Sequence, residues 1–195
     1  MSLSVLAAVA LAAAPVTLLP APQAADTACQ VLHPDRVPVA GRKSPLDSVT
    51  FSVASRPIKL CYGRPSSRGR VMLGGAAVPY GKLWRTGANE PTIFFTPVAI
   101  RLAGILVPAG KYSLYTVPDR NDWEVIVNRS TTQWGEEHNY TAAVQAQEVG
   151  RGKVKTEPLK QPTETFTIRS ARDGRGATLI LEWETTRVWI PVKPA

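Results

Sequence analysis

The clearest indication of the fold comes from the run KYSLYTV (residues 111–117), the segment PDRND (118–122) and the run WEVIVN (123–128). In the last run, Trp123, Val125 and Val127 alternate with other residues and so share one face, as the two-residue period of a β-strand requires. Pro, Asp and Asn between the runs are turn formers. We therefore predict two antiparallel strands joined by a tight turn.

Similar short segments, rich in β-branched and aromatic residues, recur along the chain between Pro and Gly residues. With the two runs above they make about ten strands: 49–54, 58–62, 70–73, 92–96, 98–102, 165–169, 178–183 and 187–192. The segment Pro108-Ala109-Gly110 predicts a second hairpin, between residues 102–107 and 111–117. The 3.6-residue period of a helix does not appear after the first 25 residues. The pattern predicts an all-β protein with one antiparallel β-sandwich or jelly-roll-like domain after an apolar leader.

The N-terminal region differs in composition from the rest of the chain. Residues 3–14 are almost entirely Leu, Val and Ala without charge, and Pro15 and Pro20 then interrupt the apolar run. Residues 1–25 therefore form either a secretory signal peptide or a retained N-terminal membrane anchor. Residues 26–48 contain several prolines and no period, which predicts a linker or arm, and residues 49–195 form the β-sandwich domain. We expect an exported protein, on the periplasmic or extracellular side, either free or anchored through its N-terminus.

The chain has two cysteines, Cys29 and Cys61. In an exported chain they fit one disulfide formed in an oxidising compartment. Two alternatives stay open: Cys29 as a lipid-modified residue, and two free buried thiols.

The formal net charge of +8 makes anionic partners plausible, among them an anionic membrane surface. The basic residues occur in short groups without interleaved aromatic residues, which argues against a nucleic-acid partner. A solvated basic surface is the plain alternative.

The run VPYGKLWRTGANE (residues 78–90) combines turn formers, two aromatic residues and three interacting polar groups. A turn at Gly87 would bring the polar side chains within reach of one another. One interpretation is an anion or sugar pocket, in which guanidinium groups bind an anion and an aromatic ring stacks on the ligand. The other, which we favour, is a buried hydrogen-bonded network that fixes a long loop to the sheet. The candidate residues are Arg64, Arg70, Tyr80, Trp84, Arg85, Asn89 and Glu90.

Catalytic groups are scarce in this sequence. The only histidines, His33 and His138, fall in the linker and in a polar segment, and we expect both at the surface. The spacing of His and Cys predicts no metal site, and no sequence motif for a cofactor appears. The pair Glu136-Glu137 with Glu90 could act as acid and base on a sugar, but an exposed turn is the simpler interpretation.

The five tryptophans divide by their neighbours. Trp123 and Trp183 lie in apolar runs and are predicted core residues. Trp84 and Trp134 adjoin glycine and polar residues, and we expect them at a surface contact.

Several motifs together resemble an exported bacterial family, domain of unknown function 2911. They are YGRPS (62–66), GR (69–70), PYG (79–81), WRTGANE (84–90), PAGKYSLYTVP (108–118), WEVIVN (123–128) and WG (134–135). The resemblance runs from about residue 44 to the C-terminus. It implies a leader followed by a β-rich domain and implies no activity. The stretch Gly150-Arg151-Gly152 departs from the apolar strand expected there, which puts the local pairing in question.

These features favour a non-enzymatic interaction module of the cell envelope, with a protein partner, or an accessory subunit of a membrane-bound complex. The alternative is a domain that binds a small ligand or carbohydrate at the Arg85, Asn89 and Glu90 cluster, with a carbohydrate-active enzyme less favoured.

Overall fold

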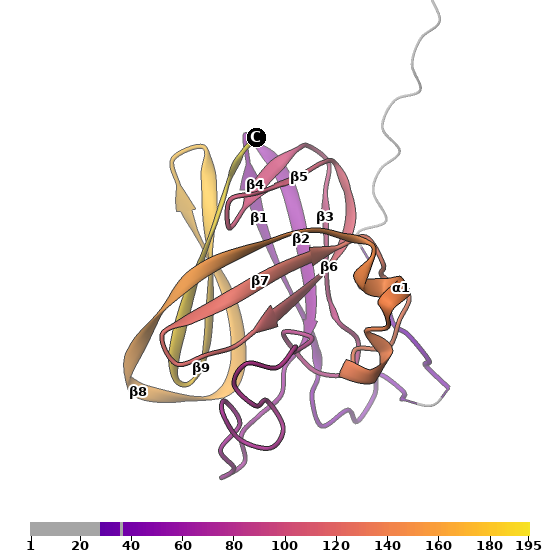
Figure 1. Ribbon diagram of the computed structural model, residues 1–195, viewed down its shortest axis with the longest axis vertical. Coiled ribbons are helices and arrows are strands. Elements are labelled where there is room, and N and C mark those ends of the chain that lie inside the picture. Colours follow the sequence, from indigo (N-terminus) through magenta and orange to yellow (C-terminus); the bar gives the residue numbers. More distant parts are fainter. Residues whose placement is uncertain (1–27, 36) are drawn as a thin grey trace, which may run out of the picture.

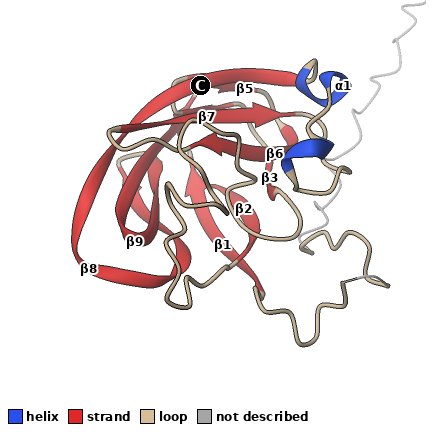
Figure 2. Ribbon diagram, turned by 60° about the horizontal axis from the view of Figure 1, so that its bottom comes forward, coloured by secondary structure: helices blue, strands red, loops and turns tan. Residues whose placement is uncertain are grey.

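The computed structural model describes residues 28–35 and 37–195, and the predicted leader, residues 1–25, lies outside them. The described chain is almost entirely antiparallel β-structure, which confirms the predicted class (Figures 1 and 2). The strands are β1 (Leu46–Val53), β2 (Arg56–Gly63), β3 (Thr92–Thr96), β4 (Ile100–Leu102), β5 (Ile105–Val107), β6 (Gly110–Val117), β7 (Asp122–Asn128), β8 (Glu148–Asp173) and β9 (Gly176–Pro194).

All nine strands belong to one sheet, in the order β1-β2-β3-β6-β7-β8-β9-β4-β5. The long strand β8 makes this possible, because its first part pairs with β7 and its later part with β9. The pairing changes from β7 to β9 between Lys155 and Thr156, and register irregularities follow between Pro158 and Thr167, within the part that pairs with β9. The sheet thereby folds back on itself around a common core, as the curved course of β8 shows in Figure 2.

The hairpin predicted for residues 111–117 and 123–128 is confirmed, since β6 pairs with β7. The hairpin predicted between residues 102–107 and 111–117 is wrong. Strand β5 pairs instead with β4, where Ile105 and Val107 bury their side chains in the core, and the segment after Val107 carries the chain across to β6 beside β3.

Residues 70–73 are not a strand. The backbone N–H groups of Met72 and Leu73 donate to the carboxylate of Glu184, at 2.9 and 2.8 Å, so a side chain takes the place of a neighbouring strand. The loop between β2 and β3 lies at the bottom of Figure 1, away from β4 and β5 at the top.

Aromatic side chains fill the centre of the core. Trp84 stacks on Trp183 with 5.5 Å between ring centroids, and its edge contacts are with Trp123 and Phe166. Trp123 and Trp183 are therefore core residues, as predicted. The prediction that Trp84 makes a surface contact is wrong: only 3% of Trp84 is exposed, and its indole N–H donates to the Gly87 carbonyl at 3.0 Å, which satisfies the polar atom.

The glycines of the Gly150-Arg151-Gly152 segment have a steric role. The segment pairs regularly with β7. A Cβ on Gly152 would lie 2.2 Å from the carbonyl oxygen of Ala103, and one on Gly150 would lie 3.0 Å from Ile105. Glycine is needed here because the β4–β5 hairpin packs directly against the start of β8.

The opposite face of the central strands is also covered. Cys61, Ile93, Ser113 and Asn128 lie opposite one another across β2, β3, β6 and β7, and all are buried although they point away from the aromatic core. The segments over them are the N-terminal residues 28–45 and the connection 129–147, which contains the short helices η1 (Glu137–Asn139) and α1 (Ala142–Gln145).

The sequence predicts no helix here, whereas the structure has these two single turns. Thr141 caps α1 by accepting a hydrogen bond from the Val144 N–H. Within residues 28–35 and 37–195, neither helix has the length or apolar composition needed to cross a bilayer.

Candidate functional site

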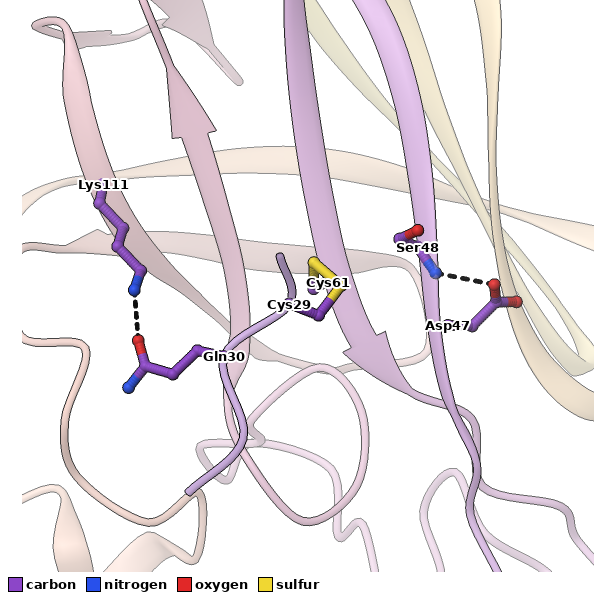
Figure 3. The surroundings of a disulfide bond; sticks show 6 residues. All are labelled: Cys29, Gln30, Asp47, Ser48, Cys61 and Lys111. Atoms are coloured by element: carbon purple, nitrogen blue, oxygen red, sulfur yellow. Dashed lines mark hydrogen bonds between the residues drawn. A yellow bond between two sulfur atoms is a disulfide. The ribbon is translucent and has the colours of Figure 1, made fainter. Parts of the chain in front are cut away.

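In the segment 28–45, here called the arm, the residues that the structure describes form no strand or helix, but they are attached to the sheet. A disulfide joins Cys29 to Cys61 on β2, as Figure 3 shows. The Gln30 side chain donates to the carbonyl of Thr131 at 2.9 Å and accepts from Lys111 at the start of β6. The predicted disulfide is thus present, and it fixes the arm across the outer face of the central strands.

Glu90 provides the second attachment of the arm. One carboxylate oxygen accepts the Leu32 N–H at 2.9 Å and one Arg42 guanidinium N–H at 3.1 Å, and the other accepts a second Arg42 N–H at 2.8 Å. The side chains of Arg42 and Glu90 are only 2% and 4% exposed. This bidentate ion pair is therefore shielded from water. Shielding strengthens the attraction between the two charges, and loss of either partner is costly because the other charge stays buried.

Arg85 and Asn89 hold a different segment. The carbonyl of Asn89 accepts from the Arg85 guanidinium at 3.3 Å and from the Gly135 N–H at 3.2 Å. A Cβ on Gly135 would lie 2.5 Å from Cδ of Arg85, so only glycine fits there. The Asn89 side chain also donates to the Ser44 carbonyl at 3.2 Å. The WRTGANE run thus ties the arm and the 129–147 connection to the sheet.

The remaining candidates lie apart from this cluster. Arg64 donates to Thr167 Oγ1 at 2.9 Å and pairs with Asp47 at 3.3 Å. Arg70 donates to the carbonyls of Ser66 and Ser67 within its own loop. The Tyr80 ring lies under the guanidinium of Arg120, at 5.1 Å. Trp84 belongs to the core. The structure therefore joins Arg85 to the Asn89 carbonyl, pairs Glu90 with Arg42 instead, and adds neither Arg64 nor Arg70 to them.

The sequence missed Arg42, the main partner of Glu90. Arg42 stands in a proline-rich segment without period, next to Lys43, and nothing distinguishes it from a solvated linker residue. The sequence provides only a general indication of such a partner: a glutamate that is buried in the fold needs a cation nearby.

The arm and the connection 129–147 enclose a cleft beside this cluster. It has a volume of about 400 Å³ and is lined by His33, Val37, Trp134, Glu136, His138 and Asn139. The His33 and Trp134 rings lie in contact, 5.7 Å apart between centroids. Trp134 is half-buried and His138 is exposed, as the sequence predicts for both. The sequence did not predict that the two histidines of the chain line one cleft, because 105 positions separate residues 33 and 138.

A second polar cluster lies on the same side of the sheet. The Tyr140 hydroxyl donates to Glu148 at 2.8 Å and accepts from Asn128 at 3.1 Å, while Arg151 donates to both carboxylate oxygens of Glu148 and to Glu124. The hydrogen bonds from Arg151 hold the pKa of Glu148 below its usual range, and burial raises the pKa of the Tyr140 hydroxyl. These groups satisfy one another, which is what a structural network requires.

Neighbouring Tyr115 joins this cluster through its ring, which packs against Tyr140 with 4.7 Å between centroids. Burial raises the pKa of Tyr115 to about 12, opposed by the hydrogen bond from Gln133. The phenol therefore stays protonated at neutral pH.

The chemistry available to the cluster around Glu90 is limited by its contacts. Glu90 is 3% exposed and bound to Arg42, so its carboxylate does not face a substrate as the sugar-cleaving hypothesis would need. Within the part of the chain that the structure describes, no three His, Cys, Asp or Glu side chains are grouped so as to hold a metal ion.

A family model described as "Protein of unknown function (DUF2911)" matches residues 44–192. The chain therefore belongs to this family, as its motifs indicated. No curated protein and no solved structure matches the chain.

Proposed function

We propose that this protein is a non-enzymatic, exported interaction module that binds a protein partner in the cell envelope, as an accessory subunit of a membrane-bound complex. The observation that supports this proposal most strongly is a group of side chains at the surface of another part of the sheet, here called the Trp189 face. It consists of side chains on β4, β5 and β9: Arg101, Leu106, Arg187, Trp189 and Lys193.

The strand register places these residues together. Arg101 on β4 lies opposite Leu106 on β5 and, on its other side, opposite Lys193 on β9. Side chains two residues apart share a face of a strand, so Trp189 and Arg187 continue the same surface along β9. Leu106 is 52% exposed and Trp189 is 39% exposed, and they are two of the four large apolar side chains exposed among the described residues.

The composition of this face suits a protein partner. The Arg187 guanidinium lies over the Trp189 ring at 5.4 Å, and the indole N–H donates to Glu157 at 2.7 Å, so the aromatic ring is held in place before binding. Trp and Arg are enriched among the residues that dominate the binding energy of protein interfaces. Strand β5, which carries Leu106, ends the strand order.

The net charge of +8 supports an acidic partner surface. The apolar leader supports export, with either cleavage or retention as an anchor. Both inferences belong to the proposal.

Ligand binding at Arg85, Asn89 and Glu90 is the less favoured function. Glu90 is buried and bound to the arm, and the Asn89 carbonyl already accepts from Arg85 and Gly135, although the buried Arg85 Nε has no hydrogen-bond partner. A ligand would have to displace those contacts before it could use them.

The test is isolation of the native protein from its own membranes, with the mass of the intact chain and the stoichiometry of its companions measured. We expect a stoichiometric partner that is lost when Leu106→Asp and Trp189→Ala are combined. Val71→Ser is the matched control, because Val71 is also exposed, at 72%, but lies in the loop between β2 and β3. A solitary, monomeric chain, or a partner retained by the double variant, contradicts the proposal. Binding to anionic vesicles alone would assign the face to lipid instead.

A further inference from the structure

We infer that the cleft between the arm and the connection 129–147 is a saccharide-binding site, with the exposed side of Trp134 as the surface on which a sugar ring packs. This inference is independent of the Trp189 face, which lies on other strands. It rests on how the two walls of the cleft are held, and on which chemical groups line it.

The first wall is the arm, and it is attached on both sides of the cleft residues. The Cys29 disulfide precedes His33, and the Glu90 contacts hold Leu32 and Arg42 around it. The chain turns at His33, whose carbonyl accepts the Val37 N–H at 2.9 Å and whose φ of 49° is unusual for a residue other than glycine. Attachment on both sides of His33 restricts the positions that the described cleft residues can take, which lowers the entropy cost of binding.

The second wall carries Trp134 and is fixed through the next residue. Gly135 is hydrogen-bonded to Asn89 and packs so closely on Arg85 that a side chain would collide with it. The WRTGANE run therefore positions both walls: Glu90 holds the arm, and Arg85 with Asn89 holds Trp134. This gives the polar cluster a positioning role beside a site, in place of the binding role considered for it from the sequence.

The groups lining the cleft favour a neutral, hydroxyl-rich ring. The apolar face of a pyranose packs on an aromatic ring, and its hydroxyl groups both donate and accept hydrogen bonds. Trp134 provides the aromatic ring. The imidazoles of His33 and His138, the amide of Asn139 and the carboxylate of Glu136 provide donors and acceptors. His138 Nε2 already lies 3.1 Å from the Asn139 amide nitrogen and 3.5 Å from a Glu136 oxygen, so these three groups form one polar edge of the cleft. Few well-placed polar groups around an apolar wall are typical of small-molecule sites.

Other ligand classes fit less well. Among the lining residues that the structure describes, none is Lys or Arg and Glu136 is acidic, which favours a neutral ligand over an anion. A metal ion would need a third ligand in range, which the described residues do not provide. The volume of about 400 Å³ accommodates one or two sugar rings.

The two histidines make the test direct, because a tag-free protein has only two imidazole C2–H signals in its proton NMR spectrum. The signals are assigned with His33→Gln and His138→Gln. The probes are maltotriose, cellotriose and triacetylchitotriose, with choline as a cationic comparison. We expect at least one trisaccharide to shift both signals along one saturable curve, and Trp134→Ala to weaken that binding at least tenfold.

Trp134→Phe retains an aromatic ring and should keep part of the affinity, and Val71→Ser, which lies outside the cleft, should keep all of it. The disulfide and the near-ultraviolet circular dichroism check that each variant is folded. If Trp134→Ala does not fold, the comparison of wild type, Trp134→Phe and Asn139→Ala takes its place, with Asn139→Ala expected to weaken binding. The inference is overturned if no trisaccharide shifts either signal at millimolar concentration, if removing the aromatic ring or the Asn139 amide leaves the affinity unchanged, or if choline alone binds.

Discussion

The two faces of the central strands bury opposite kinds of groups. On the inner face, Leu60, Phe94 and Leu114 meet the aromatic cluster of the core. On the outer face the buried residues include Ser113 and Asn128, whose side chains donate to the carbonyls of Ser130 and Val144, both at 2.7 Å. The outer layer is therefore held by a disulfide, hydrogen bonds and ion pairs, whereas the inner layer is held by apolar burial.

The two kinds of burial predict how far the effect of a mutation extends through the structure. Loss of apolar contacts in the core weakens every strand that shares it, because burial is a property of the whole interior. Loss of a polar attachment in the outer layer should release one segment while the sheet persists. The predictions below test that distinction.

The largest effect is expected for Trp84→Ala. The ring packs against three other aromatic side chains in the core, and its removal leaves a cavity that the neighbouring strands cannot fill. We expect a loss of about 4 to 5 kcal/mol in the free energy of unfolding, measured with urea. Trp134→Ala is the matched variant and should cost far less, since the cleft is open to water. Similar losses in both variants would remove the distinction between the two layers.

Glu90→Ala should be almost as costly at its own site, but local in its consequences. It leaves the buried Arg42 without a counter-charge, with only its hydrogen bonds to the Val37 and Pro38 carbonyls, and about 3 to 5 kcal/mol is typical for such a loss. We expect limited proteolysis to cut within residues 28–45 well before the strands. The double variant Glu90→Leu with Arg42→Met removes both charges and should recover most of the stability. If the double variant is as unstable as Glu90→Ala, the hydrogen bond from Leu32 rather than the ion pair holds the arm.

Removal of the disulfide, by replacing Cys29 and Cys61 with alanine, should cost about 3.7 kcal/mol for a closed loop of this length, where the cysteines are 32 residues apart. Because the disulfide and Glu90 hold the same arm, the two losses should be less than additive when combined, since the arm is released only once. Combined with Trp84→Ala, either loss should be nearly additive. Full additivity between the disulfide and Glu90 would show that they stabilise different segments.

The sequence predicted the inner layer better than the outer layer, for a physical reason. Alternation in WEVIVN places Trp123, Val125 and Val127 on the core face, and β7 follows that pattern. Apolar burial leaves a period in the sequence because every second residue takes part in it. The burial of Trp84 was not predicted in this way, because its neighbours in the sequence are glycine and polar residues although its own ring is buried.

The outer layer depends on single contacts between distant residues, which leave no period. Arg42 finds Glu90 across 48 positions, and Gly135 finds Asn89 across 46, from residue 135 to residue 89. The first part of β8 was missed for a related reason: Gly150 and Gly152 weaken its strand signal because the β4–β5 hairpin needs their space. The concentration of aromatic, glycine and polar residues in WRTGANE did indicate a specific arrangement there. It did not indicate that this run attaches the arm and the connection 129–147 to the sheet.

The smallest predicted effect concerns the charges on the outer face. Hydrogen bonds from Arg151 lower the folded-state pKa of Glu148, so the pair stabilises the fold fully above the ordinary glutamate pKa of about 4.3. That stabilisation is lost as the pH falls through the lowered folded-state value. Arg151→Gln should therefore destabilise the protein at pH 7. The difference in free energy of unfolding between this variant and wild type should shrink as the pH falls through the lowered pKa of Glu148. The measurement is urea unfolding of both proteins across the acid range.

Lys155→Gln is the control on the same strand, because Lys155 is 86% exposed and lies 3.9 Å from Asp122, so water screens that pair. It should change stability little at any pH. A deficit of Arg151→Gln that stays constant across the acid range would mean that Arg151 acts through packing of its aliphatic chain, and the outer face would then resemble the inner one more than its polar composition suggests.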